Sequence, residues 1–113
     1  MKIGIRQNQG VTILDPKGKI TIGSGDIALR DSVLEALDSG SRKILINLKD
    51  VSTIDSSGIG ELVAAFTTVT NRGGKLKLVG LPPKVSDILQ ITQLVTVFEV
   101  LDTEDEAMST FAE

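Results

Sequence analysis

The chain has 113 residues, a formal net charge of −3 at pH 7 and 41 % hydrophobic residues. This length and composition suit one ordinary domain with an aliphatic core, so we expect residues 1–113 to form a single domain. The negative charge disfavours direct binding of nucleic acid, which requires a basic stripe. The sequence contains no cysteine and no histidine, which excludes disulfides, thiolate ligands and the commonest general base of enzymes.

The sequence gives no sign of a membrane. No apolar run reaches the ~18–20 residues of a membrane-spanning helix. The first ten residues, MKIGIRQNQG, lack the hydrophobic region of a secretory signal. We therefore expect a cytoplasmic protein with no membrane span.

Hydrophobic alternation predicts three short strands at the start of the chain. Residues 2–8 alternate isoleucines with polar residues, which is the period of a half-buried strand. Residues 10–15 and 18–23 are two further candidates, and the turn-forming sequence DPKG lies between them. Apolar residues at helical spacing from Asp26 then predict a helix that Gly40 ends.

The middle of the chain predicts two parallel strands joined by a helix. Residues 43–48 form a nearly continuous apolar run that suits an interior strand, and residues 75–80 form another strand. Between them, apolar residues from Ile59 to Val69 recur at offsets of 3, 4, 7 and 10, which defines one face of a helix. A strand, a helix and a strand in this order form a right-handed crossover with parallel strands.

The last third of the chain predicts two helices and one short strand. Pro82 and Pro83 suit the first turn of a helix. Residues 95–100 are a strand candidate, and Thr103 with Glu106 forms a capping-box pair before a last, acidic helix. The order of all these elements predicts a small α/β domain with a mixed sheet.

The segment TIDSSGIG, residues 53–60, separates a hydrophobic strand candidate from the central helix. Loops at the carboxyl ends of parallel strands often carry function, and a helix start offers free N–H groups that stabilise an anion. A purely structural interpretation is that Ser56 or Ser57 caps the helix while Gly58 and Gly60 shape the turn. Capping explains one serine, but it leaves the second serine, the adjacent acid and the two glycines unexplained.

A catalytic role for these serines finds no support elsewhere in the sequence. A serine nucleophile needs a base, and the chain has no histidine, no Ser-x-x-Lys spacing and no G-x-S-x-G elbow. Asp55 and Glu61 are a thin ligand set for a cation, and no P-loop motif is present. We expect no enzymatic activity, no metal and no cofactor. The remaining interpretation is that one serine receives a phosphate, which adds charge without refolding the domain.

The segments INLKDVSTIDSSGIGELV and GGKLKLVGLPPKVSDILQITQLVTVFEV resemble the STAS domain, specifically the bacterial anti-sigma factor antagonists. The resemblance covers nearly the whole chain and implies a STAS-like α/β fold, with a mixed sheet and helices packed mainly on one face. It implies that Ser56, directly after the Asp, is phosphorylated by a partner that is both anti-sigma factor and serine kinase. Ser57 is the alternative acceptor.

The same resemblance implies a cycle of binding and release. The unphosphorylated form would bind the anti-sigma factor and free the sigma factor, and a phosphoserine phosphatase would restore that form. STAS domains also serve in other signalling assemblies and in transport systems. The alternative function is therefore a scaffold or transport-associated subunit that binds a protein or small ligand without a phosphate cycle.

One position departs from the pattern of this family. Members often carry an acidic GE-[IL]-D sequence, whereas this chain reads Gly18-Lys19-Ile20-Thr21, so Thr21 stands where an Asp is usual. If that Asp helps to dock the kinase, the partner of this chain differs from the usual one.

The outer side of the central helix carries mostly small residues, whereas an ordinary exposed face is rich in Lys, Glu and Gln. Small residues either lie under a neighbouring segment of the same chain or form a flat docking surface. We favour a docking surface that is continuous with Ser56. The expected partner-binding residues are Thr21, Ser24, Asp55, Ser57, Gly58, Gly60, Glu61, Ala64, Ala65 and Thr68.

Overall fold

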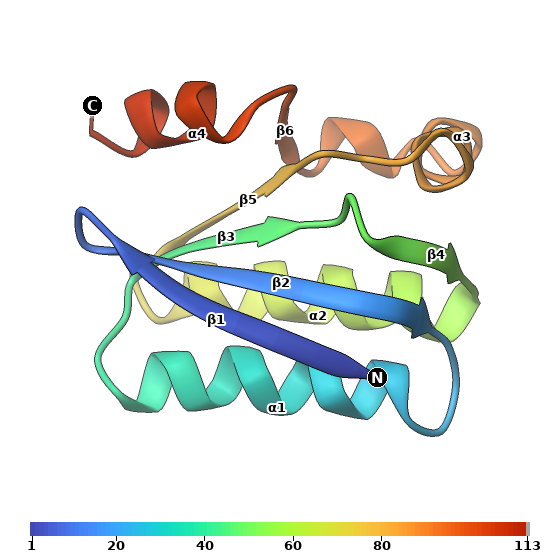
Figure 1. Cartoon of the computed structure of the whole chain (residues 1–113), viewed down its shortest axis with the longest axis horizontal. Helices are drawn as coiled ribbons and strands as arrows, with labels where there is room; N and C mark the ends of the chain where they lie inside the picture. The colour runs from blue at the N-terminus through green and yellow to red at the C-terminus, as the bar shows by residue number, and fades with distance from the viewer. Residues whose placement is uncertain (113) are drawn as a thin grey trace.

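The computed structural model describes residues 1–112, which form one mixed six-stranded sheet flanked by helices (Figure 1). The expected domain, 1–113, ends at Glu113, which lies outside the described residues. The elements, in chain order, are β1 (Lys2–Asn8), β2 (Val11–Ile20), α1 (Gly25–Asp38), β3 (Lys43–Asn47), β4 (Val51–Ile54), α2 (Ser56–Asn71), β5 (Lys75–Val79), α3 (Pro83–Ile91), the 3-10 helix η1 (Leu94–Thr96), β6 (Glu99–Leu101) and α4 (Glu104–Phe111).

The sheet runs in the order β1-β2-β3-β5-β6, and β4 pairs with the far end of β2. β1 and β2 are antiparallel, and every other pair is parallel. The predicted parallel arrangement of the strands at 43–48 and 75–80 is confirmed, because β3 and β5 pair in register from Lys43↔Lys75 onward.

The two strand candidates at 10–15 and 18–23 were wrong as separate elements, because β2 continues through the DPKG sequence to Ile20. Pro16 has no N–H to donate, and it falls between the part of β2 that pairs with β3 and the part that pairs with β4. The register then shifts between Gly18 and Lys19, and Gly18 adopts a φ of +109°. A bulge therefore bends the strand where the sequence suggested a turn.

Two other predictions of strands need correction. β4, at Val51–Ile54, was missed, because four residues are too few for a clear alternation and its partner is the end of β2. The strand expected at 95–100 is divided into η1 and a shorter β6 that begins at Glu99.

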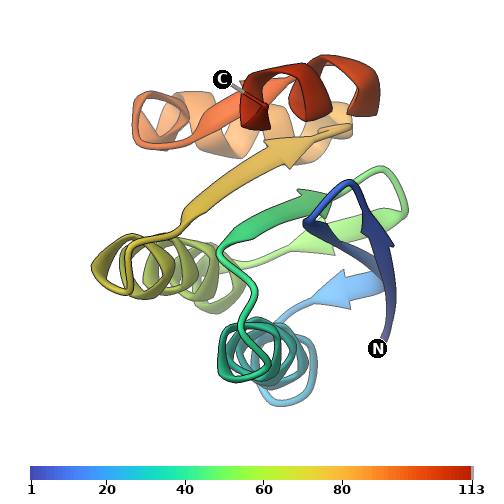
Figure 2. The ribbon, with the colours of Figure 1, turned by 90° about the vertical axis from the view of Figure 1, so that its left-hand side faces the viewer.

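The helices divide between the two faces of the sheet (Figures 1 and 2). α1 and α2 lie side by side on one face, over a core of buried aliphatic side chains to which α3 contributes Val85 and Leu89. α4 covers part of the opposite face through Ala107 and Phe111. Its start is the expected capping box, in which Thr103 Oγ1 accepts the N–H of Glu106 at 3.2 Å. The helices therefore lie mainly on one face, as expected.

Candidate phosphorylation and docking site

Two adjacent parallel strands carry the candidate site. β2 ends at Ile20 and β4 ends at Ile54, and these two residues are register partners. The loop at 21–24 then leads into α1, while Asp55 leads into α2. The loop before α1 and the start of α2 therefore lie side by side at the carboxyl ends of these two strands, although they are far apart in the sequence.

Two glycines allow both helices to start directly on the end of β2. A Cβ at Gly25 would lie 2.1 Å from the carbonyl oxygen of Lys19, and a Cβ at Gly58 would lie 2.1 Å from that of Ile20. Both glycines are buried. Gly58, one of the expected partner-binding residues, therefore serves close packing inside the domain, whereas Gly60 is exposed and faces open space.

The cap of α2 is Asp55 and neither serine, contrary to the structural interpretation of the sequence. Asp55 Oδ1 accepts the N–H of Gly58 at 2.9 Å, and its Oδ2 accepts the N–H of Ile22 at 3.0 Å. These hydrogen bonds, from Gly58 first and then from Ile22, lower the pKa of Asp55 below its ordinary value. The carboxylate therefore holds α2 and the loop before α1 together.

The two serines differ in their access to solvent. Ser56 is the first residue of α2 and is exposed, whereas Ser57 is half-buried. Within residues 1–112, neither hydroxyl makes a hydrogen bond to another side chain. Because Asp55 already caps the helix, the Ser56 hydroxyl is left without a structural role at an exposed helix start.

The loop before α1 presents a hydrophobic side chain that the sequence did not identify as functional. Ile22 is 74 % exposed. The loop is held in place by Asp26, whose Oδ1 accepts the N–H groups of Gly23 and Ile27 at 3.1 and 2.8 Å. Of the two expected partner-binding residues here, Ser24 is exposed and Thr21 is half-buried. One feature of the sequence could have identified Ile22 as exposed. The strand ends at Ile20, so an apolar side chain two residues later lies beyond the hydrophobic core.

The expected docking side of α2 is partly covered by α1. Gly60 and Ala64 are exposed, and Glu61 and Thr68 are half-buried. Ala65 is only 6 % exposed and belongs to the hydrophobic core. A groove of about 230 Å³ runs between α1 and α2 beside these residues. The alternative interpretation, burial by the same chain, therefore holds for Ala65. The exposed small residues, Gly60 and Ala64, lie nearer the start of the helix.

An ion pair joins the two helices along this groove. Arg30 of α1 donates from Nε and Nη2 to the two carboxylate oxygens of Glu61, each at 2.9 Å. This bidentate contact raises the pKa of Arg30. Glu61, an expected partner-binding residue, is therefore already bound to a cation of its own chain, which the sequence did not reveal.

The described part of the chain holds no group of three or more His, Cys, Asp or Glu residues that could bind a metal ion. Among residues 1–112, no helix combines the length and the apolar character needed to cross a membrane.

The model of the STAS domain family matches residues 2–107. The chain belongs to the STAS domain family. A protein of Thermotoga maritima that carries the provisional name of anti-sigma factor antagonist is 33 % identical over 98 residues, which are 87 % of this chain and 87 % of that protein. The anti-sigma-B factor antagonist of Bacillus subtilis is 30 % identical over 100 residues, 88 % of this chain and 90 % of that one.

Solved structures agree with this STAS domain in fold. The crystal structure of the Thermotoga maritima protein TM1081 superposes with a TM-score of 0.91 at 28 % identity, over 98 % of this chain and 95 % of that chain. The anti-sigma factor antagonist SpoIIAA in its unphosphorylated form gives a TM-score of 0.74 at 17 % identity, over 98 % of each chain. The likeness to SpoIIAA shows the shared fold alone.

Proposed function

We propose that this STAS domain is a phosphorylation-switched anti-sigma factor antagonist. In its unphosphorylated form it binds an anti-sigma factor that is also a serine kinase, and the sigma factor is released. The kinase phosphorylates Ser56, and a phosphoserine phosphatase reverses the modification. The protein acts in the cytoplasm by binding and catalyses no reaction itself.

The observation that carries this proposal is that Ser56 is exposed at the start of α2, while the adjacent Asp55 caps the helix. Asp55 holds the first turn through the N–H of Gly58, so the exposed Ser56 stands at an ordered helix start without serving as its cap. The relatives at 30 % and 33 % identity bear names of anti-sigma factor antagonists. SpoIIAA, of the same fold, exists in a phosphorylated form.

A phosphate on Ser56 would act on the partner rather than on the fold. It adds about −1.5 to −2 charges at an exposed position. Arg30, a cation of the neighbouring helix α1, is already bound to Glu61. A partner pressed against the helix start must therefore desolvate the new charge. A penalty of ~3 kcal/mol lowers affinity more than a hundredfold, which suffices for a switch.

The test uses two variants of the acceptor and one matched control. Ser56→Ala should bind the cognate anti-sigma factor as the native protein does and resist phosphorylation. Ser56→Asp should lose binding. Ser57→Ala, at the adjacent half-buried serine, should still be phosphorylated. Calorimetry with the purified anti-sigma factor measures binding, and incubation with the kinase and ATP followed by mass spectrometry measures phosphorylation. Equal affinity of the native protein and Ser56→Asp would contradict the switch.

A scaffold or transport-associated role remains the alternative, because the exposed Ile22 and Ala64 would serve any protein partner. A pull-down from the native cell separates the two. The proposed function predicts that an ATP-binding serine kinase is recovered, whereas the alternative predicts a permease or another signalling protein.

A further inference from the structure

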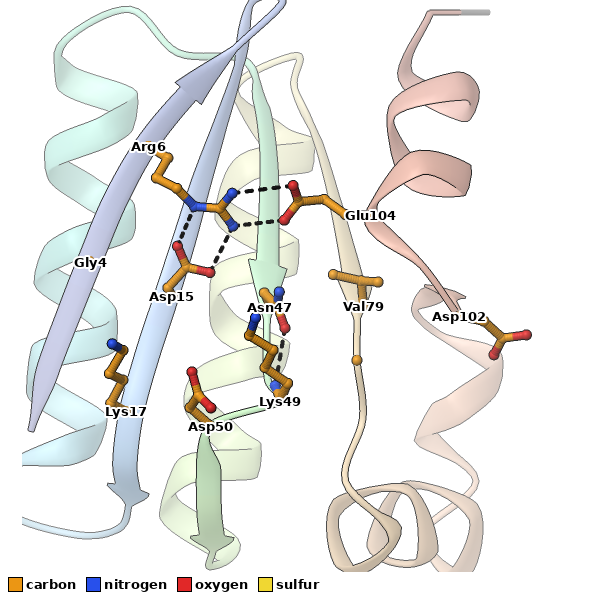
Figure 3. A pocket seen from close by; sticks show the side chains of 11 residues that line it. Gly4, Arg6, Asp15, Lys17, Asn47, Lys49, Asp50, Val79, Asp102 and Glu104 are labelled. Atoms are coloured by element: carbon orange, nitrogen blue, oxygen red, sulfur yellow. Dashed lines mark hydrogen bonds and ion pairs between the residues drawn. The ribbon is translucent and has the colours of Figure 1, made fainter.

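The sheet face opposite α1 and α2 is only half covered, and its open half forms a hollow. Under α4, β2 and β3 present the apolar residues Val11, Ile13 and Leu45. Further along the same two strands, the residues on this face become Asp15, Lys17 and Asn47. The change from apolar to charged residues coincides with the end of the cover, and a hollow of about 690 Å³ lies there (Figure 3).

The floor of the hollow contains one amide that is nearly buried. Asn47 is 7 % exposed, and its Oδ1 accepts the N–H of Lys49 at 3.1 Å. Its Nδ2 makes no hydrogen bond within residues 1–112 but is not sealed from the hollow. Gly80, at a φ of +71°, leaves room for this side chain, because a Cβ there would lie 2.7 Å from Asn47 Oδ1. The chain therefore preserves space for an amide that still has a donor to offer.

One wall of the hollow is a fixed network of charges. Arg6 donates to Asp15 from Nε at 2.6 Å and from Nη2 at 2.9 Å, and it also contacts both carboxylate oxygens of Glu104 at 2.7 and 3.2 Å. These contacts join β1, β2 and the start of α4. Because Arg6 is committed to two carboxylates, it shapes the wall and is not available to a ligand.

Two lysines and one aspartate near the floor are uncommitted. Lys17 and Lys49 form no ion pair with any carboxylate among residues 1–112, and the same holds for Asp50. Figure 3 shows Lys17 and Lys49 with Asp50 between them, while the carboxylate of Asp102, another residue of the lining, is turned away from the two lysines. The ammonium groups of Lys17 and Lys49 and the amide donor of Asn47 therefore surround one acceptor, the carboxylate of Asp50.

We propose that this hollow binds a small organic anion that also carries hydroxyl groups. The anionic group lies between the ammonium groups of Lys17 and Lys49 and accepts a hydrogen bond from Asn47 Nδ2. A hydroxyl of the same ligand donates to Asp50. A phosphate ester and a carboxylate share this chemistry, and each is a separate arm of the test. The site is distinct from Ser56 and does not depend on the proposed phosphate cycle.

The test is an NMR titration of the full chain with glycerol 3-phosphate, glycerate, inorganic phosphate and glycerol. We expect at least one hydroxylated anion to bind and to shift the amide signals of Asn47 and Gly80. It should bind more tightly than inorganic phosphate, because only the hydroxylated ligand satisfies Asp50, and glycerol alone should not bind. Lys17→Gln and Lys49→Gln should each weaken binding about tenfold. Lys43→Gln, at an exposed lysine outside the hollow, is the matched control.

Asn47→Asp adds a second line of evidence, because it keeps the acceptor for the Lys49 N–H and replaces the free donor with a charge. It should abolish binding while the thermal unfolding curve shows a folded protein. The proposal is overturned if none of the anions binds at millimolar concentration. It is also overturned if Lys43→Gln weakens binding as much as Lys17→Gln, or if inorganic phosphate binds as tightly as both hydroxylated anions.

Discussion

The carboxylate of Asp55 bridges two backbone N–H groups, that of Ile22 at 3.0 Å and that of Gly58 at 2.9 Å. The residue directly before the candidate phosphoserine therefore positions both the start of α2 and the loop that exposes Ile22. A partner that docks on Ser56 meets a surface whose two parts are held together by one side chain.

Replacement of Asp55 should have a pH-dependent effect on stability. The hydrogen bonds from Gly58 and Ile22 lower the folded-state pKa of Asp55. A lowered pKa contributes stability that is fully present above the unfolded value of ~3.9 and is lost as pH falls through the folded value. We expect the native protein to be more stable than Asp55→Asn near neutral pH. The difference should shrink as pH falls below about 4.

Urea unfolding of both proteins across this pH range gives the measurement. Asn can still accept the N–H of Gly58 through its one amide oxygen, so the comparison removes the charge of the carboxylate together with its second hydrogen bond, the one from the N–H of Ile22. A difference in the free energy of unfolding that stays constant down to acid pH would show that the Asp55 charge is not linked to folding.

Gly58 and Gly60 should respond in opposite ways to alanine. Gly58→Ala places a Cβ 2.1 Å from the Ile20 carbonyl oxygen and 2.6 Å from Ile54 Cγ1. We therefore expect the free energy of unfolding to fall by about 1–3 kcal/mol or more. Gly60→Ala meets nothing within 4 Å and removes a flexible residue from the helix, which should stabilise the fold by about 0.5–1 kcal/mol. Chemical unfolding of the pair is the check, and equal stability of the two variants contradicts the packing described.

Ala64 and Ala65 form a second matched pair, on the docking side of α2. Ala64 is exposed, so Ala64→Arg should leave the melting temperature unchanged while it weakens partner binding. Ala65 is buried against α1, so Ala65→Arg should overpack the core and lower stability by about 1–3 kcal/mol or more. Thermal melting and a binding assay on both variants decide the matter. A large loss of stability in Ala64→Arg is the contrary result.

Ile22→Ser tests the loop that Asp55 holds. The side chain is 74 % exposed and contributes little to the core, so stability should change by less than about 0.5 kcal/mol. Affinity for the anti-sigma factor should fall, because an apolar side chain beside Ser56 gains from burial in an interface. Calorimetry with the purified partner measures this. Unchanged affinity would remove Ile22 from the docking surface.

Much of the fold could be predicted from periodicity. The core face of α1 and the parallel strands β3 and β5 follow from local spacing, and Leu29, Val33 and Leu37 are buried as expected. The errors lie where long-range pairing overrides a local signal. Pro16 and Gly18 suggested a turn, but the change of partner from β3 to β4 accommodates both residues within one strand.

The site was less accessible to sequence reasoning, because its contacts join residues far apart in the chain. The segment TIDSSGIG identified the right region, yet the capping role of Asp55 and the burial of Gly58 depend on the end of β2. The pairing of Arg30 with Glu61 depends on the contact between two helices. The uncommitted amide of Asn47 becomes apparent only from the fold, in which α4 covers the apolar half of this sheet face and leaves the half with Asn47 open.

The central claim is that Ser56 is the phosphate acceptor, and mapping the phosphate by mass spectrometry tests it most directly. The native protein is incubated with its cognate kinase and ATP, then digested and sequenced, with Ser56→Ala and Ser57→Ala treated in parallel. We predict one phosphate on Ser56, present in the native protein and in Ser57→Ala and absent from Ser56→Ala. Phosphate found only on Ser57, or on neither serine, would contradict the account.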